Sequence, residues 1–222
     1  MSNRVYLTKS RFKLATECPT KLYYTGKSKE YADTKKDDEF LQSLAEGGFQ
    51  VGELAKLMYP GGIEIEAQGH AAQLEATQAL LVRQEVTLFE PALSHERLFV
   101  RVDILEKKGN AVRLIEVKSK SYDPNDEQFF RGKKGQINSD IRPYLMDVAF
   151  QTYVVLQAMP GHRVTPYLML PDKSKAATVD ARLQFEEISN EERQAWEQAL
   201  LKYCELDTLA MVMVVEGWRA WT

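Results

Sequence analysis

Hydrophobic positions along the chain switch between helical and strand spacing, and this alternation predicts a mixed α/β protein. Helices are expected where apolar residues recur every three or four positions, or where strong helix formers cluster: residues 9–24 with a break at Pro19, 37–58 with a break at Gly47–Gly48, 71–83, 144–158 and 190–218. Strands are expected in short apolar or alternating tracts: residues 63–66, 86–93, 98–105, 111–118 and 163–170. This order predicts a mixed central sheet flanked by helices.

The length of the chain fits one α/β domain with a helical appendage. We expect residues 1–180 to form the domain and residues 181–222 to form a C-terminal helical extension packed on it. No stretch approaches the run of about 18 apolar residues that a membrane span needs, and no apolar signal core follows the N-terminus. The two cysteines, Cys18 and Cys204, make no disulfide framework. We therefore expect a cytoplasmic protein with no membrane association.

Net charge neither identifies nor excludes a nucleic-acid partner. The chain carries 29 basic and 32 acidic residues, for a net charge of −3. Basic residues nevertheless gather in the first 36 positions and again just after Phe129 and Phe130, which favours a polyanion locally. The candidate nucleic-acid contacts from these two groups are Lys9, Arg11, Lys21, Arg131, Lys133 and Lys134. The alternative for Arg131, Lys133 and Lys134 is a disordered, solvated loop.

The most informative stretch is the strand pair around residues 107–110, which are typical of a tight hairpin turn. A two-residue loop at either of two positions places Asp103 opposite Leu114 or opposite Glu116. Because side chains alternate between faces along a strand, both registers put Asp103, Glu116 and Lys118 on one face. A three-residue loop would separate them, so the prediction depends on this turn.

Two acids and a lysine on one face of otherwise apolar strands are costly unless they bind something. A hard divalent cation such as Mg²⁺ is typically held by one or two carboxylates, waters and a substrate phosphate. Lys118 would then orient or deprotonate a water, or stabilise transition-state charge. The alternative is a solvent-facing hairpin in which Glu116 and Lys118 form a weak exposed ion pair.

The arrangement of Asp103 before Glu116-Val117-Lys118 resembles the signature of the PD-(D/E)XK nuclease superfamily. More narrowly, the chain resembles the branch that contains RecB-type and AddB-type exonuclease domains and the CRISPR-adaptation Cas exonucleases. Three further segments lie in the order that this branch shows: Ser10-Arg11 with Cys18-Pro19-Thr20-Lys21-Leu22-Tyr23-Tyr24, Gly48 to Glu53, and Asp147 to Tyr153. The resemblance spans roughly residues 5–175.

The resemblance implies a restriction-endonuclease-like fold and metal-dependent hydrolysis of phosphodiester bonds in DNA, from an end. It implies that Asp103 and Glu116 hold Mg²⁺ or Mn²⁺ with help from the Val117 carbonyl. Lys118 would position or activate the water, and Gln151 would contact the substrate or orient Lys118. A buried amide that caps a loop is the other interpretation of Gln151.

The chain departs from the branch at several positions. The helical histidine is absent, with Gly52 in its place, so Glu53 is the candidate additional ligand and Glu90 its rival. The helical tyrosine is displaced to Tyr153. Many relatives carry an iron–sulfur cluster on four cysteines; two thiolates cannot hold one, so we expect none and interpret Cys18 as a small buried hydrophobe.

These departures keep other functions open. One is a catalytically inactive nuclease-fold module that binds nucleic acid or partner proteins. Another is a scaffold that uses the C-terminal helix, with Met211, Met213, Trp218 and Trp221, for a protein partner or self-association. The segment around Asp207 also resembles the last helix of DEDD-type exonucleases, but its apolar spacing also fits a packing helix, which is the favoured interpretation.

Overall fold

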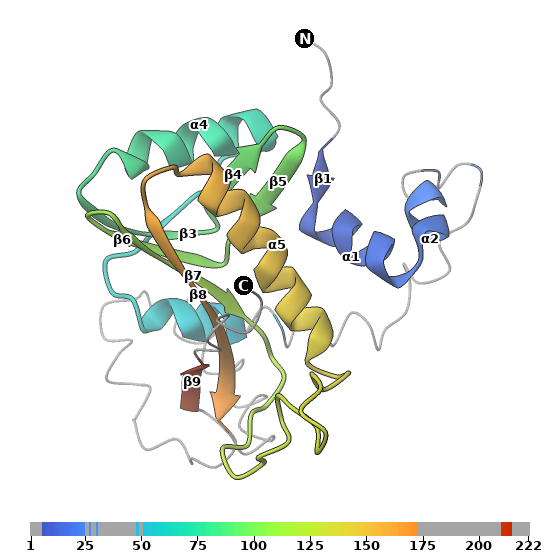
Figure 1. Cartoon of the computed structure of the whole chain (residues 1–222). Coiled ribbons are helices and arrows are strands. Elements are labelled where there is room, and N and C mark those ends of the chain that lie inside the picture. Colours follow the sequence, from blue (N-terminus) through green and yellow to red (C-terminus); the bar gives the residue numbers. More distant parts are fainter. Residues whose placement is uncertain are drawn as a thin grey trace, which may run out of the picture.

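The computed structural model describes residues 6–24, 27, 30, 48 and 51–172 and the backbone of residues 210–214 (Figure 1). Its labelled helices are α1 (Lys9–Glu17), α2 (Pro19–Tyr24), α4 (His70–Leu81) and α5 (Arg142–Ala158), and residues 51–57 are also helical. Thr8 caps the start of α1, and the predicted break at Pro19 separates α1 from α2. Within these described ranges, no helix combines the length and apolar character needed to cross a membrane.

The strands form two sheets of mixed direction. The first has three strands in the order β1-β5-β4: β1 (Leu7–Thr8), β5 (Leu98–Arg101) and β4 (Ala92–His95). The second has six strands in the order β2-β3-β6-β7-β8-β9: β2 (Ile63–Glu64), β3 (Glu85–Phe89), β6 (Ile104–Lys108), β7 (Ala111–Val117), β8 (Arg163–Asp172) and β9 (Ala210–Val214). The predicted α/β class with a mixed sheet and flanking helices is therefore confirmed.

The larger sheet lies between helices on both faces. Leu105, Val112 and Leu114 pack against Phe150 and Val154 of α5 on one face. On the other face, the helix at residues 51–57 contributes Ala55 to a cluster that it shares with four strand residues: Phe89, Ile104, Ile115 and Met169. The alternation of side chains along β6 and β7 supplies both cores from the same two strands.

The turn between β6 and β7 has the predicted two-residue length. Lys108 pairs with Ala111, so Gly109 and Asn110 form the loop, and Gly109 has a positive φ of 57°. This register is one of the two expected, and it sets Ile104 opposite Ile115. The ladder ends at this pair, so Asp103 and Glu116 are the residues immediately beyond it.

Two of the expected strands are each broken into two shorter strands. The first breaks at Glu90, whose positive φ of 54° turns the chain before Pro91. The second breaks beside it, at Val102 and Asp103. Hydrogen bonds from the Glu90 N–H to the Asp103 carbonyl (3.1 Å) and from the Val102 N–H to the Pro91 carbonyl (3.1 Å) join the two breaks. Asp103 consequently lies at a bend where the chain passes between sheets, not inside a continuous strand.

The C-terminal region differs from the expectation where the structure describes it. Residues 210–214, expected within a helix at 190–218, form β9, antiparallel to β8. The helix prediction is wrong there because β8 offers an unpaired edge to a valine-containing segment of high β propensity. The remainder of the expected extension, including Cys204, Asp207, Trp218 and Trp221, lies outside the described residues.

Candidate functional site

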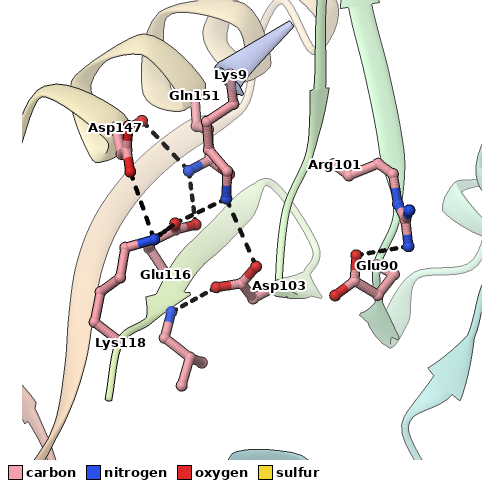
Figure 2. Close-up of polar contacts among 9 residues, drawn as sticks. Lys9, Glu90, Arg101, Asp103, Glu116, Lys118, Asp147 and Gln151 are labelled. Carbon is pink, nitrogen blue, oxygen red and sulfur yellow. Dashed lines mark hydrogen bonds and ion pairs between the residues drawn. The ribbon is translucent and has the colours of Figure 1, made fainter. Parts of the chain in front are cut away.

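Glu116 is the centre of the candidate site. It lies near the end of β7 and is fully buried. Figure 2 shows three side chains that converge on its carboxylate. Lys9 donates to Oε1 at 2.8 Å, Lys118 donates to the same oxygen, and Gln151 donates to Oε2 at 2.7 Å. A buried carboxylate is tolerated here because cationic and amide donors replace its water.

Asp103 provides the second carboxylate. Its Oδ2 accepts a hydrogen bond from the Val117 N–H at 2.7 Å, which fixes the side chain against the end of β7. Its Oδ1 lies 3.8 Å from Lys9 Nζ. The Lys9 ammonium therefore lies between Asp103 and Glu116, and the structure brings the predicted Asp103, Glu116 and Lys118 together at one site.

Helix α5 completes the arrangement with two polar residues on its buried face. Asp147 and Gln151 are four positions apart and so project from the same side of the helix. The Asp147 carboxylate lies 3.5 Å from Lys118 Nζ. Gln151 is fully buried, and its Oε1 finds no hydrogen-bond partner among the residues that the structure describes. Gln151 thus acts on Glu116, as a positioning residue, and lies beyond the reach of a substrate in this conformation.

A cavity of about 430 Å³ opens beside Asp103 and Lys118. Val117 lines it, as do both candidates for an additional ligand, Glu53 and Glu90. Glu53 is ion-paired with Lys56 at 2.6 Å, and Glu90 is ion-paired with Arg101 at 2.8 Å. Both carboxylates therefore face the cavity already carrying a basic partner, and the structure does not favour one over the other.

The two carboxylates of the site have opposite protonation preferences. Burial alone would raise the pKa of Glu116, but the ammonium groups of Lys9 and Lys118 outweigh it and lower this pKa to about 2. Burial and the adjacent Glu116 charge raise the pKa of Asp103 to about 7, against the opposing effect of the two lysines. Burial by itself would lower the pKa of Lys118, yet Glu116 raises it, so Lys118 is protonated at neutral pH.

The predicted nucleic-acid contacts separate into different environments. Lys9 points inward to the carboxylates. Arg11 donates to the Tyr6 carbonyl at 3.1 Å, and Lys21 is ion-paired with Glu17 at 2.8 Å. The three basic residues of the loop before α5 are exposed: Arg131, Lys133 and Lys134.

The aromatic residues of that loop are used mainly for packing. Phe129 is buried in a cluster with Ile141 and Leu145, and half-buried Phe130 packs against Phe129 with a ring-centroid separation of 4.9 Å. A base therefore cannot stack on Phe129 in this conformation. The loop offers its charge to a polyanion more readily than its rings.

Two further expectations concern single residues. Cys18 is half-exposed between α1 and α2, so the expected burial is wrong; the chain turns there before Pro19. The N–H groups of Lys21 and Thr20 lower the pKa of the Cys18 thiol. Tyr153 is exposed on the outer side of α5, two positions after Gln151, and its ring meets that of His95 at 6.5 Å.

Sequence reasoning missed the roles of two residues. Asp147 had a usable signal, since its four-residue spacing from Gln151 places both on one helix face. Lys9 had none, because 107 positions separate it from Glu116 and only tertiary structure brings them together.

The donor set fits a hard divalent cation that keeps several water ligands. Within the described ranges, no three His, Cys, Asp or Glu side chains gather as a ready-made metal-binding group. Asp103 and Glu116 nevertheless already share a cation, the Lys9 ammonium, beside an open cavity. Mg²⁺ commonly uses only one or two carboxylates and completes its shell with water and phosphate. Asp103, Glu116 and the Val117 carbonyl would hold such an ion.

Comparison of the chain with protein-family models, with curated proteins and with solved structures finds no match. The function proposed below therefore depends on the geometry of the site and on the resemblance of its motifs.

Proposed function

We propose that this protein is a Mg²⁺- or Mn²⁺-dependent nuclease that hydrolyses phosphodiester bonds in DNA. The observation that carries the proposal is the pairing of Asp103 and Glu116 around one cation, with Asp103 and Lys118 lining the adjacent cavity. Glu116 lies on β7, while Asp103 immediately precedes β6 and Lys118 immediately follows β7. Backbone hydrogen bonds from the Glu90 N–H to the Asp103 carbonyl and from the Lys118 N–H to the Met169 carbonyl hold the two flanking residues in place.

The order of elements supports a restriction-endonuclease-like fold. Strands β3, β6 and β7 are antiparallel neighbours, with β4 and β5 of the smaller sheet between β3 and β6 in the chain. Helix α5 then follows β7, and β8 returns parallel to β7. This order, with the acidic pair and lysine around β7, resembles the core of PD-(D/E)XK nucleases. Cleavage from a DNA end is the expectation for the RecB- and AddB-type branch and rests on that resemblance.

The chemistry divides between the metal and the chain. A bound Mg²⁺ or Mn²⁺ supplies Lewis acidity to the phosphate and lowers the pKa of a coordinated water. Asp103 and Glu116 fix the position of that charge, and Gln151 fixes Glu116. Lys118, protonated at neutral pH, stabilises the negative charge that develops on the phosphate oxygens. The exposed Arg131, Lys133 and Lys134 would hold the DNA backbone by charge.

Incubation with end-labelled single-stranded and double-stranded DNA tests the proposal directly. We expect degradation with Mg²⁺ or Mn²⁺ and none with EDTA, and the product ladder separates cleavage from an end from internal cleavage. Intact substrates under every condition, together with no metal binding by calorimetry, would contradict the nuclease proposal.

Metal affinity is expected to rise with pH across neutrality. The pKa of Asp103 is raised to about 7, so its carboxyl is mostly protonated at pH 6 and mostly ionised at pH 8. Because the metal needs the ionised form, we expect Mn²⁺ to bind about tenfold more tightly at pH 8 than at pH 6. Titration calorimetry at the two pH values measures this. In Asp103→Asn the affinity should be low at both, and an equal slope in that variant would assign the titration elsewhere.

A second candidate function is a nuclease-fold module without turnover that binds nucleic acid or a partner protein. The Lys9 ammonium favours it, since a cation of the chain is already ion-paired with both carboxylates. Salt-sensitive DNA binding without metal-dependent cleavage would select this function. The expected partner contact through a C-terminal helix finds no support at residues 210–214, which form a strand.

A further inference from the structure

Lys9 is delivered to the site by a short, well-anchored segment. Strand β1 pairs in parallel with β5, which ends two residues before Asp103. Thr8 then caps α1, accepting from the Arg11 N–H at 3.4 Å, so that Lys9 begins the helix next to the larger sheet. Phe12 stacks on Phe150 of α5 with a ring-centroid separation of 4.5 Å. These contacts hold the N-terminal segment in place, and Lys9 reaches inward from it (Figure 2).

The Lys9 ammonium uses the same oxygens that a divalent ion would need. Its Nζ lies 2.8 Å from Glu116 Oε1 and 3.8 Å from Asp103 Oδ1, and its side chain is only 25% exposed. Lys118 also donates to Glu116 Oε1. A divalent cation bound between the two carboxylates would meet two ammonium groups at close range in a poorly hydrated site, where like charges repel strongly.

Lys118 and Lys9 differ in what else holds them. Lys118 has a second carboxylate, Asp147, at 3.5 Å on the side of α5. The ion pairs of Lys9 are both with the presumed metal ligands, Asp103 and Glu116, among the residues that the structure describes. A metal ion is therefore expected to displace the Lys9 ammonium and to leave the Lys118 ammonium in place.

We propose that Lys9 is a built-in counter-cation that competes with the divalent metal for Asp103 and Glu116. It rests on the proposed function, because it assumes that the two carboxylates bind metal. In the metal-free protein Lys9 is ion-paired with both carboxylates and ties α1 to the sheet. Metal binding releases the Lys9 side chain, so the N-terminal segment sets the metal concentration at which the site becomes occupied.

Replacement of Lys9 by methionine tests the competition. We expect Lys9→Met to bind Mn²⁺ about tenfold more tightly than the unmodified protein by titration calorimetry, because the metal no longer displaces a paired cation. Lys9→Arg keeps the charge and should retain the weaker affinity. Lys13→Met, one turn along α1 at an exposed position, is the matched control and should change nothing.

Chemical protection of the unmodified protein gives a readout that needs no variant. With Mn²⁺, acylation of the Lys9 amine, followed by mass spectrometry, should become several-fold faster than in EDTA, because the released amine is no longer paired. Acylation of Lys13 should be the same in both buffers.

The outcomes separate this inference from the nuclease proposal. Suppose that the unmodified protein binds Mn²⁺, that Lys9 is acylated at the same rate with Mn²⁺ and with EDTA, and that Lys9→Met binds Mn²⁺ no more tightly. This result overturns the competition and leaves the nuclease proposal standing. Binding of Mn²⁺ by Lys9→Met but not by the unmodified protein supports the proposal, and it would mean that Lys9 prevents metal binding altogether. No Mn²⁺ binding by either protein overturns both.

Discussion

Replacing Lys118 with methionine is expected to reduce the metal-dependent cleavage rate by about 1,000-fold. The Lys118 ammonium lies between Glu116 and Asp147, and its raised pKa keeps it charged at neutral pH. Lys118 also lines the cavity beside Asp103. Methionine keeps much of the side-chain length and removes the charge. The loss should therefore appear mainly in kcat, measured under saturating DNA and Mg²⁺, with little change in DNA affinity.

The matched control for this variant is Lys108→Met. Lys108 lies on the same hairpin, but it is exposed and pairs with Glu106 on the opposite face of the sheet. The Lys108→Met variant should cleave DNA at the rate of the unmodified protein. Circular dichroism would establish that both variants fold. Undiminished cleavage by folded Lys118→Met would remove Lys118 from the mechanism and with it the strongest link to the PD-(D/E)XK signature.

Glu116→Gln is expected to lower the free energy of unfolding of the metal-free protein by about 3 kcal/mol at pH 7. The substitution keeps the shape of the side chain but leaves Lys9 and Lys118 beside a neutral group in a buried site. It also sets a second amide against Gln151, whose N–H now donates to the carboxylate. Urea unfolding followed by circular dichroism measures the change, and calorimetry should show that metal binding is lost.

The same substitution has a pH signature. The pKa of Glu116 is lowered from an ordinary value of 4.5 to about 2, so its stabilisation is complete above about pH 4.5 and is lost as the pH falls towards 2. The difference in stability between the unmodified protein and Glu116→Gln should therefore be full at pH 7 and smaller at pH 3. Glu127→Gln, in the exposed part of the loop before α5, should have no effect at either pH. A difference that persists unchanged at pH 3 would show that Glu116 acts by packing alone.

Local sequence determined the part of the site that lies on one hairpin. The tight turn around Gly109 allows few registers, and each expected two-residue register places Asp103, Glu116 and Lys118 on one face. Strand alternation then requires no knowledge of the rest of the chain. The same holds for α1, α4 and α5, which the apolar spacing and the clustering of helix formers predicted.

Tertiary structure decided everything that depends on segments far apart in the chain. The bend at Glu90 and Asp103 arises because the β4–β5 hairpin leaves the larger sheet to pair with β1, which no local pattern encodes. Residues 210–214 form a strand because β8 offers them an edge, although their composition also fitted a helix. Lys9 reaches Glu116, 107 positions away in the sequence, because β1 and α1 pack beside the larger sheet.

The sequence by itself thus determined the acidic pair, the lysine and the face they share, because hairpin geometry is local. Only the tertiary structure decided that Glu116 is fully buried, that Gln151 and Lys9 hold it, and that Asp103 faces a cavity. The reason is physical: burial and long-range electrostatics depend on which distant segments exclude water from a side chain. The pKa values of Asp103 and Glu116, and with them the chemistry of the site, follow from that packing.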